Sequence, residues 1–456
     1  EMFPRSCGAD ERTHGTLRDC AARLPYLASM GFDVLYLPPI HPIGRTRRKG
    51  PDGRAGAGPE DPGSPWAIGA VEGGHAAVHP ALGSLADFDF LVREAARHGI
   101  EIALDLAFQC SPDHPWVVEH PEWFRRRRDE GAPSEHEDIL PIDFDTAERR
   151  ELWEALRDVV LFWARRGVRI FRADNPHTKP FLFWEWLIRE VQSRHADAVF
   201  LAEAFTRPKL LRRLSKSGFS QSYTYFTWRN TKQELIDYFT EVQLGEARQY
   251  LRPHLFANTP DVLPEYLQHG GRPAFQARLI LAATLAGSYG IYGPAFELCE
   301  RRAIAPGSEH YADSEKYRIR RWNLEDPSSL GDLAARLNRI RRDNPALRHD
   351  RSLRFVTVEN EHILCFARAT PDRSNVLLVA VNLDPHHYQG GWTDLPLGEL
   401  GLDARRPFQV HDLLSDARYA WQGPRNFIGL DPFLMPAHVL RVRHPTRSEN
   451  DFEYFF

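Results

Sequence analysis

Four acidic residues stand at or just beyond the ends of short apolar segments, where acids from different segments can meet. They are Asp105, Asp174, Glu203 and Asp261. A single acid after a strand is commonly a helix cap, but four acids on successive elements indicate a shared site. Cleavage of a glycosidic bond needs such a set, with one ionised carboxylate as nucleophile and one protonated carboxyl as general acid. From this pattern alone, glycoside chemistry and structural capping both remain open.

The apolar segments before these acids alternate with amphipathic helical segments, which is typical of a parallel α/β sheet. We predict strands at residues 34–37, 101–106, 168–174, 199–203, 251–258 and 288–291, with 1–4 as a candidate first strand. We predict helices at residues 16–30, 84–98, 148–166, 181–194 and 275–285. Ser84 and Asp87 have the spacing of a capping box. The commonest closed form of this alternation is a (β/α)8 TIM barrel, and a doubly wound sheet is the alternative.

Two long irregular segments interrupt the alternation of strands and helices. From about residue 353 the alternation stops and the pattern is one of short strands only. Residues 38–83 and 110–147 are rich in loop-forming types, as functional loops often are. We therefore expect a catalytic barrel over residues 1–349, with a small inserted B domain over 107–147, and a C-terminal all-β sandwich over 350–456. Strands are predicted there at residues 353–358, 362–366, 376–383, 408–413 and 439–442.

Bulk properties narrow the class of protein. The chain has 456 residues and a formal net charge of -4, so we expect no nucleic-acid partner. It has no apolar run long enough to span a membrane. Five scattered cysteines without C-x-x-C spacing favour a reducing cytoplasm and indicate neither a disulfide framework nor a zinc site. Because the sequence begins at Glu1 rather than Met, the lack of a visible signal segment carries little weight.

Short motifs surround the four acids. They read Val168-Arg-Ile-Phe-Arg-Ala-Asp174, Phe200-Leu-Ala-Glu203, Asn258-Thr-Pro-Asp261 and Ala103-Leu-Asp105. In this order along the chain, they resemble the strand-four, strand-five, strand-seven and strand-three motifs of the α-amylase superfamily. That resemblance implies a (β/α)8 barrel and a retaining double displacement.

Departures from ordinary amylases point to one family within the superfamily. Gln109-Cys110 stands where amylases usually have Asn-His, and Pro260 stands where they have His before the third acid. With segments 36–44, 48–50, 65–69, 72–75, 109–116, 174–180, 221–230 and 314–317, these features resemble the bacterial GlgE-type α-1,4-glucan:maltose-1-phosphate maltosyltransferases. The resemblance implies transfer of a maltosyl unit from maltose 1-phosphate to the non-reducing end of an α-1,4-glucan.

The same resemblance implies a role for each site residue. Asp174 is the nucleophile, Glu203 the general acid and base, and Asp261 stabilises the transition state, while Arg172 pairs with Asp174 and lowers its pKa. The residues implied to bind substrate are Lys49, Gln109, Lys316 and Tyr317 for the donor sugars and Asn175 for the donor phosphate. For Asp105, a ligand contact and a buried partnership with Arg172 both stay open. No cofactor or metal is implied, and a homodimer is left open.

One segment departs from the family pattern. Between Glu122-Trp-Phe and Pro141-Ile-Asp-Phe, the family carries a loop with Asn, Lys and Tyr that holds the donor phosphate, whereas this chain has Ser134-Glu-His-Glu137. Acids beside a phosphate dianion are unfavourable unless they are screened. The run Arg125–Arg128 offers replacement cations, since arginine suits phosphate, although a solvated charge run is its common fate. The family's N-terminal β-sandwich and helical parts have no counterpart in these residues.

Two other interpretations therefore remain. One keeps the retaining chemistry but uses a neutral oligosaccharide donor, as an α-glucan hydrolase or glucanotransferase does. The other is an inactive glucan-binding scaffold, which the joint presence of Asp174, Glu203, Asp261 and Arg172 argues against, because a binder does not need that set.

Overall fold

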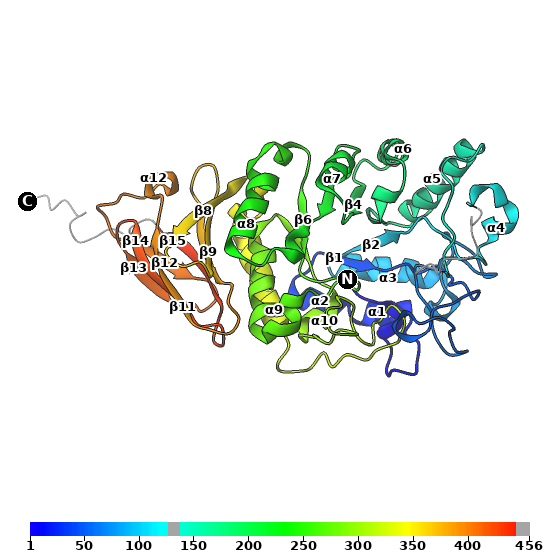
Figure 1. The fold of residues 1–456 in the computed structure, drawn as a ribbon, viewed down its shortest axis with the longest axis horizontal. Coiled ribbons are helices and arrows are strands. Elements are labelled where there is room, and N and C mark those ends of the chain that lie inside the picture. The colour runs from blue at the N-terminus through cyan, green and yellow to red at the C-terminus, as the bar shows by residue number, and fades with distance from the viewer. Residues whose placement is uncertain (126–136, 444–456) are drawn as a thin grey trace, which may run out of the picture.

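Seven parallel strands form one curved sheet in the order β1-β2-β3-β4-β5-β6-β7 in this computed structural model, which describes residues 1–125 and 137–443 (Figure 1). They are β1 (Val34–Leu37), β2 (Glu101–Leu106), β3 (Ile170–Asp174), β4 (Val199–Glu203), β5 (Gln221–Tyr223), β6 (Pro253–Phe256) and β7 (Ser288–Gly290). The predicted parallel sheet is confirmed, with β5 as an addition. β5 has three residues, too few for a periodicity to show in the sequence.

The N-terminal residues link the two ends of this sheet. The backbone N–H of Met2 donates to the carbonyl oxygen of Tyr36 in β1 (3.1 Å). The terminal amine of Glu1 donates to the carbonyl oxygen of Ile291, directly after β7 (2.8 Å). No strand is assigned to residues 1–4, but this segment occupies the place of the predicted first strand and closes the barrel.

Helices follow most of the strands and cover the outside of the sheet (Figure 1). They are α1 (Leu17–Ala22), α2 (Leu24–Met30), α3 (Leu85–Arg97), α4 (Pro115–Glu119), α5 (Arg149–Arg165), α6 (Phe181–Gln192), α7 (Pro208–Ser215), α8 (Lys232–Phe239), α9 (Glu265–Leu285), α10 (Gly293–Glu297) and α11 (Gly331–Asp343). Ser84 and Asp87 form the predicted capping box at the start of α3. Within the described residues, no helix is both long and apolar enough to cross a membrane.

Proline and glycine explain two differences from the predicted helices. The segment predicted as one helix at 16–30 is two helices, because Pro25 stands at the start of α2 and cannot continue a preceding helix. Helix α9 begins at Glu265, earlier than predicted, and it is kinked at Gly271, whose φ is 58°. The kink lies just before Pro273. Because a proline normally ends a helix predicted from sequence, the prediction covered only the part of α9 after this residue.

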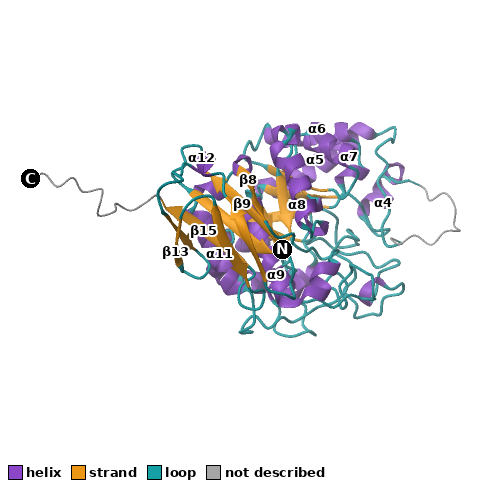
Figure 2. Cartoon of the chain, turned by 60° about the vertical axis from the view of Figure 1, so that its left-hand side comes forward, coloured by secondary structure: helices purple, strands orange, loops and turns teal. Residues whose placement is uncertain are grey.

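The C-terminal part is an antiparallel sheet of eight strands in the order β13-β12-β15-β10-β9-β8-β11-β14 (Figure 2). They are β8 (Leu353–Val358), β9 (Ile363–Ala369), β10 (Val376–Asn382), β11 (Gln389–Asp394), β12 (Phe408–Asp412), β13 (Arg418–Trp421), β14 (Arg425–Leu430) and β15 (Ala437–Arg443), with a short helix α12 (Leu397–Leu400). Phe366 and Val379 share an apolar cluster with Leu281 of α9, so this part packs directly on the barrel. The all-β character is confirmed.

Strand register brings the acids together at the carboxyl end of the barrel. Asp174 at the end of β3 pairs in register with Glu203 at the end of β4. Asp105 in β2 pairs with Arg172 in β3. Partners in a parallel ladder direct their side chains to the same face, so all four side chains point into the barrel. The predicted barrel thus explains how acids far apart in sequence converge.

Candidate active site

Arg172 is the centre of the candidate site and contacts three carboxylates. Its Nη1 lies 2.7 Å from Asp105 Oδ2 and 2.7 Å from Asp174 Oδ1, and its Nη2 lies 3.2 Å from Glu203 Oε1. All four side chains are less than 10 % exposed. A guanidinium presents several donors in a fixed plane, so one residue can hold several carboxylates in a defined arrangement.

Asp105 is the buried partner of Arg172. Its side chain is fully buried, and the Tyr36 hydroxyl donates to the same Oδ2 at 2.5 Å. Burial raises the pKa of Asp105 to about 6, against the opposing effect of Arg172. Of the two roles that the sequence left open, the structure supports the structural one. Tyr36 was not singled out from the sequence as a site residue, because a tyrosine in an apolar strand looks like core.

Glu203 has the electrostatic character of an acid–base catalyst. Burial raises its pKa from the ordinary 4.5 to about 7; Arg172 acts in the opposite direction, and Asp174 adds to the rise. The backbone N–H of Asn175 donates to Glu203 Oε2 at 3.3 Å and fixes its second oxygen. A carboxyl with a pKa near the working pH can give and take a proton with comparable ease.

The turn after β3 positions Asp174, the predicted nucleophile. Asn175 is in the left-handed region, with φ 44° and ψ 52°, so the chain reverses sharply after Asp174. The Lys179 ammonium donates to the carbonyl oxygens of Asp174 (3.0 Å) and Asn175 (3.3 Å) and holds this turn. The Asn175 side chain is exposed at the turn. The motif 174–180 contained Lys179, but nothing in its spacing indicated that it binds backbone.

Asp261 forms a second part of the site with Lys316. The Lys316 ammonium donates to Asp261 Oδ1 and also lies 4.8 Å from the centre of the Trp66 ring. Burial would raise the pKa of Asp261, but Lys316 and Arg172 outweigh it, and the pKa lies below the usual range. Asp261 is therefore ionised at neutral pH. The charge of Asp261 also contributes to the raised pKa of Glu203. The Asp261–Lys316 pair therefore interacts electrostatically with the group of carboxylates around Arg172.

Three of the predicted substrate-binding residues, Gln109, Lys316 and Tyr317, lie around Trp66. Lys49 is the exception. The Gln109 side-chain amide donates to the Trp66 carbonyl oxygen at 3.3 Å. Lys316 lies 5.9 Å from the centre of the Tyr317 ring, and that ring packs against Gly53, in the loop that carries Lys49. The backbone of Lys49 pairs with Ala55, and its side chain has no hydrogen bond or ion pair with any described residue.

The altered loop is only partly within the described residues. Arg126–Arg128 and Ser134–His136 fall in 126–136, outside them. Arg125 is described, and its guanidinium lies 3.2 Å from Asp143 Oδ1 and 3.6 Å from Asp145 Oδ2. Its side chain is 58 % exposed. This arginine is already paired with two carboxylates.

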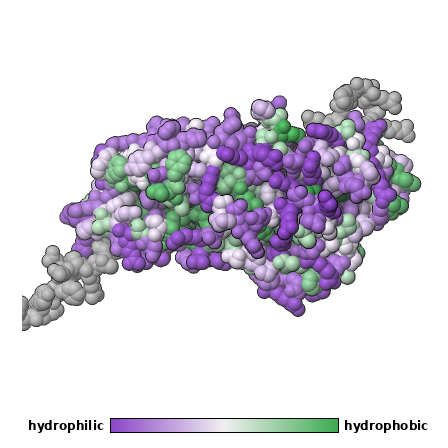
Figure 3. Space-filling view, turned by 90° about the horizontal axis from the view of Figure 1, so that it is seen from below, coloured by the Kyte–Doolittle hydropathy of each residue, from purple (hydrophilic) through white to green (hydrophobic). Residues whose placement is uncertain are grey.

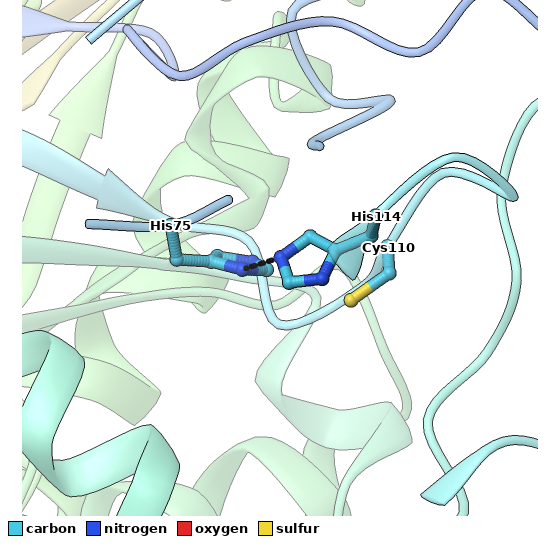
Figure 4. Close-up of side chains that lie close together, drawn as sticks. All are labelled: His75, Cys110 and His114. Carbon is cyan, nitrogen blue, oxygen red and sulfur yellow. Dashed lines mark hydrogen bonds between the residues drawn. The ribbon is translucent and has the colours of Figure 1, made fainter. Parts of the chain in front are cut away.

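A buried His–Cys–His group supports the segment that carries Gln109 (Figure 4). His75 Nε2 lies 3.0 Å from the Ala107 carbonyl oxygen, so it carries a proton and leaves Nδ1 as an acceptor. His114 Nδ1 accepts from the Trp116 backbone N–H (3.1 Å), so the proton is on Nε2 and points at His75 Nδ1 (3.1 Å). A cation on His114 Nε2 would move that proton to Nδ1, against the Trp116 N–H. With Cys110 Sγ nearby, the arrangement fits a neutral hydrogen-bonded pair better than a metal centre.

Comparisons with known proteins agree on one family. The family model described as "GLGE, C-terminal" matches residues 355–442. An α-1,4-glucan:maltose-1-phosphate maltosyltransferase from Chlorobaculum tepidum is 51% identical, with 98% of this chain and 68% of the relative covered. One from Rhodospirillum rubrum is 54% identical, with 97% and 65% covered. The chain thus spans about two thirds of the length of these curated relatives.

Solved structures show the same fold at low sequence identity. An α-amylase from Anoxybacillus has a TM-score of 0.75 at 19% identity, with 98% of each chain covered. A maltogenic α-amylase from Thermotoga neapolitana has a TM-score of 0.73 at 18% identity, with 96% of each covered. These likenesses confirm the predicted barrel with its C-terminal β part.

Proposed function

Since this chain belongs to the family of α-1,4-glucan:maltose-1-phosphate maltosyltransferases, we propose that it moves a maltosyl unit from maltose 1-phosphate to the non-reducing end of an α-1,4-glucan. The observation that carries the proposal is the register pairing of Asp174 with Glu203, with Arg172 in contact with both. This pairing brings together a nucleophile and a proton donor, the two groups that a retaining displacement needs.

In the first step, Asp174 attacks the anomeric carbon of the donor. Its Oδ1 is held by Arg172, so Oδ2, which has no hydrogen bond to a described residue, is the attacking oxygen. The bond from the anomeric carbon to the phosphate oxygen breaks, and the proton of Glu203 passes to the departing phosphate. The product is a β-maltosyl ester of Asp174.

In the second step, the ionised Glu203 takes the proton of the acceptor's 4-hydroxyl. That oxygen attacks the anomeric carbon, the ester bond to Asp174 breaks, and a new α-1,4 bond forms. Two inversions give net retention. The pKa of about 7 suits both proton transfers of Glu203.

The surrounding residues bind and orient the sugars. We assign Asp261, kept ionised by Lys316, to the hydroxyls of the reacting ring and to the positive charge that develops there. Lys49, Gln109, Lys316 and Tyr317 are assigned to the two donor sugars. Asn175, exposed on the turn after the nucleophile, is assigned to the donor phosphate. The five cysteines are free, in keeping with a cytoplasmic site of action.

A second function is favoured by the altered loop. Arg125 is already paired with Asp143 and Asp145, and acids stand where the family holds phosphate. A site with this loop suits a neutral donor, as in an α-glucan hydrolase or glucanotransferase.

One experiment separates the two functions. The protein is incubated with maltose 1-phosphate and maltohexaose, and inorganic phosphate and chain lengths are measured. Release of phosphate with glucans two units longer supports the maltosyltransferase. Redistribution of maltohexaose without phosphate release replaces it with the neutral-donor function.

A further inference from the structure

A large cavity lies between the barrel and the C-terminal sheet, and we call it the interdomain cavity. Its volume is about 1210 Å³. On the barrel side it is lined by Gln221 at the start of β5, by Arg252 just before β6 and by Gly287 just before β7. On the other side it is lined by Arg354 of β8 and Ala369 of β9. The cavity is thus at the amino ends of barrel strands, whereas the candidate active site is at their carboxyl ends.

Arginine is the dominant charged residue of the interdomain cavity. Three separate segments of the chain contribute six arginines to the lining: Arg248, Arg252, Arg348, Arg351, Arg354 and Arg373. The acidic residues among the described residues of the lining are Asp350 and Glu399. Six arginines against two acids leave four positive charges in excess, although the whole chain has a formal net charge of -4. Positive charge is therefore concentrated here against the overall balance.

Most of these guanidinium groups have no acidic partner, and all six arginines are exposed. Within residues 1–125 and 137–443, four have neither a side-chain hydrogen bond nor an ion pair: Arg248, Arg252, Arg351 and Arg373. Arg348 donates to the carbonyl oxygen of Arg342. Arg354 lies 3.5 Å from Glu399, but the two side chains are 60% and 64% exposed, and such a pair is weak. The cations are thus available to a ligand.

The segment between α11 and β8, which carries two of the arginines, is fixed against the barrel. Arg368 of β9 is fully buried, and its Nε donates to Ser352 Oγ at 2.8 Å. Its Nη1 donates to the Leu285 carbonyl oxygen, at the end of α9, at 2.6 Å. Asp350 Oδ1 accepts from the Gly287 backbone N–H at 2.6 Å. The arginines of this segment are therefore carried by a backbone that is held in place, as a binding site requires.

We propose that the interdomain cavity binds a small molecule that carries two or more linked phosphate groups. A guanidinium presents its donors in a planar fork that fits two oxygens of a phosphate. One phosphate group carries a charge of about -1.5 to -2 near pH 7, so two linked groups match the excess positive charge of the lining. Protein on both sides of the cavity excludes part of the solvent and strengthens this attraction. The proposal does not depend on maltosyl transfer.

Convergence and size distinguish this cavity from an ordinary charged surface. Charged side chains alone would not support a site, since hydrophilic residues cover most of the face shown in Figure 3. Here the arginines come from the barrel and from the C-terminal part and line one cavity. Its volume is close to the roughly 300–1,000 Å³ of small-molecule sites. A nucleic acid strand would need an extended basic surface, which a net charge of -4 does not favour.

Isothermal titration calorimetry with sodium tripolyphosphate tests the proposal. The cavity variant is Arg252→Gln with Arg351→Gln, which removes one unpaired arginine from each side. The matched control is Arg93→Gln with Arg165→Gln, because these exposed arginines of α3 and α5 are outside the lining. It removes the same charge. We expect wild type and control to bind alike. The cavity variant should bind about a hundredfold more weakly, at about tenfold for each lost hydrogen bond to a charged group.

Thermal melting supplies a second measurement. Without ligand, the cavity variant should keep the wild-type melting temperature, since neither arginine has a partner to lose. Tripolyphosphate should raise the melting temperature of wild type and control more than sodium chloride of equal ionic strength does, and the cavity variant should lack this rise. Any phosphate contact in the candidate active site persists in all three proteins, so the difference between them isolates the cavity. Turnover should be equal in all three.

The choice of probes decides the chemistry of the ligand. Tighter binding of ATP than of tripolyphosphate assigns the cavity to nucleotides, and equal binding assigns it to the linked phosphates themselves; both support the proposal. Unchanged affinity in a folded cavity variant overturns it, as does an equal loss in the control. Absence of a tripolyphosphate effect on wild type overturns it without any variant. Equal affinity for citrate rejects the preference for phosphate, and tighter binding of a single-stranded oligonucleotide rejects a small-molecule site.

Discussion

Replacing Glu203 by Gln should change how the stability of the protein depends on pH. The pKa of Glu203 is raised from 4.5 to about 7 by burial, and the side chain is 8% exposed. A carboxyl whose pKa is higher in the folded state binds its proton more tightly there. The folded state therefore loses stability as the pH rises through this window, and the loss is complete above it. At 1.36 kcal/mol per pKa unit, the loss is about 3 kcal/mol.

Glutamine has nearly the same shape and does not ionise, so Glu203→Gln should escape that loss. Relative to wild type, the variant should gain up to about 3 kcal/mol between about pH 5 and pH 8. Urea unfolding at several pH values measures the free energy of unfolding of both proteins. The change in their difference with pH is the test, because any effect of the amide that is the same at every pH cancels. Glutamine at 203 should also abolish turnover of maltose 1-phosphate.

Asp261→Asn supplies a control of opposite sign. The pKa of Asp261 is lowered in the folded state, so its ionisation stabilises the protein at neutral pH, and this contribution disappears as the pH falls through that pKa. The asparagine variant should be less stable than wild type near pH 7 and should approach it in acid. If wild type and Glu203→Gln show parallel stability from about pH 5 to pH 8, Glu203 does not titrate in this window, and the electrostatic reasoning for its role is refuted.

Three further predictions concern the mechanism. Asp174→Ala should abolish turnover while the circular dichroism spectrum stays that of wild type, because no covalent route remains; residual turnover near the wild-type rate would remove Asp174 from the mechanism. Glu203→Ala should still react with maltosyl fluoride, whose leaving group needs little protonation, and a β-maltosyl adduct on Asp174 should accumulate in intact mass spectra; an adduct on another acid would reverse the assignment. Replacing Arg125–Arg128 by Gln should raise KM roughly tenfold to a hundredfold for maltose 1-phosphate but not for maltosyl fluoride if these arginines hold phosphate. Equal responses to both donors would make them a solvated charge run, an outcome that the pairing of Arg125 with Asp143 and Asp145 already favours for that member.

The sequence predicted those parts of the fold and the site in which a catalytic residue type follows a regular apolar segment. Strand ends at Asp174 and Glu203 were predictable because each follows a short apolar run, and the barrel then required these side chains to meet. The three-residue β5, the largely exposed β13 and the alternating β11 and β14 were missed, since neither length nor apolar content marks them. Lys179 was equally hidden, because its partners are carbonyl oxygens, which leave no trace in the sequence.

Charge balance connects the geometry of the site to the question of its donor. In the proposed mechanism Asp105, Asp174 and Asp261 act as carboxylates, and Arg172 and Lys316 are already in contact with them. Lys179 is close by, but it is bound to backbone carbonyl oxygens. With Glu203 protonated, these six groups are balanced and a dianionic donor meets no net repulsion. When Glu203 ionises, the same groups repel the donor. In the proposed mechanism, the proton that the leaving phosphate needs is thus also the one whose presence removes this repulsion, so that donor binding and the first chemical step depend on a single carboxyl.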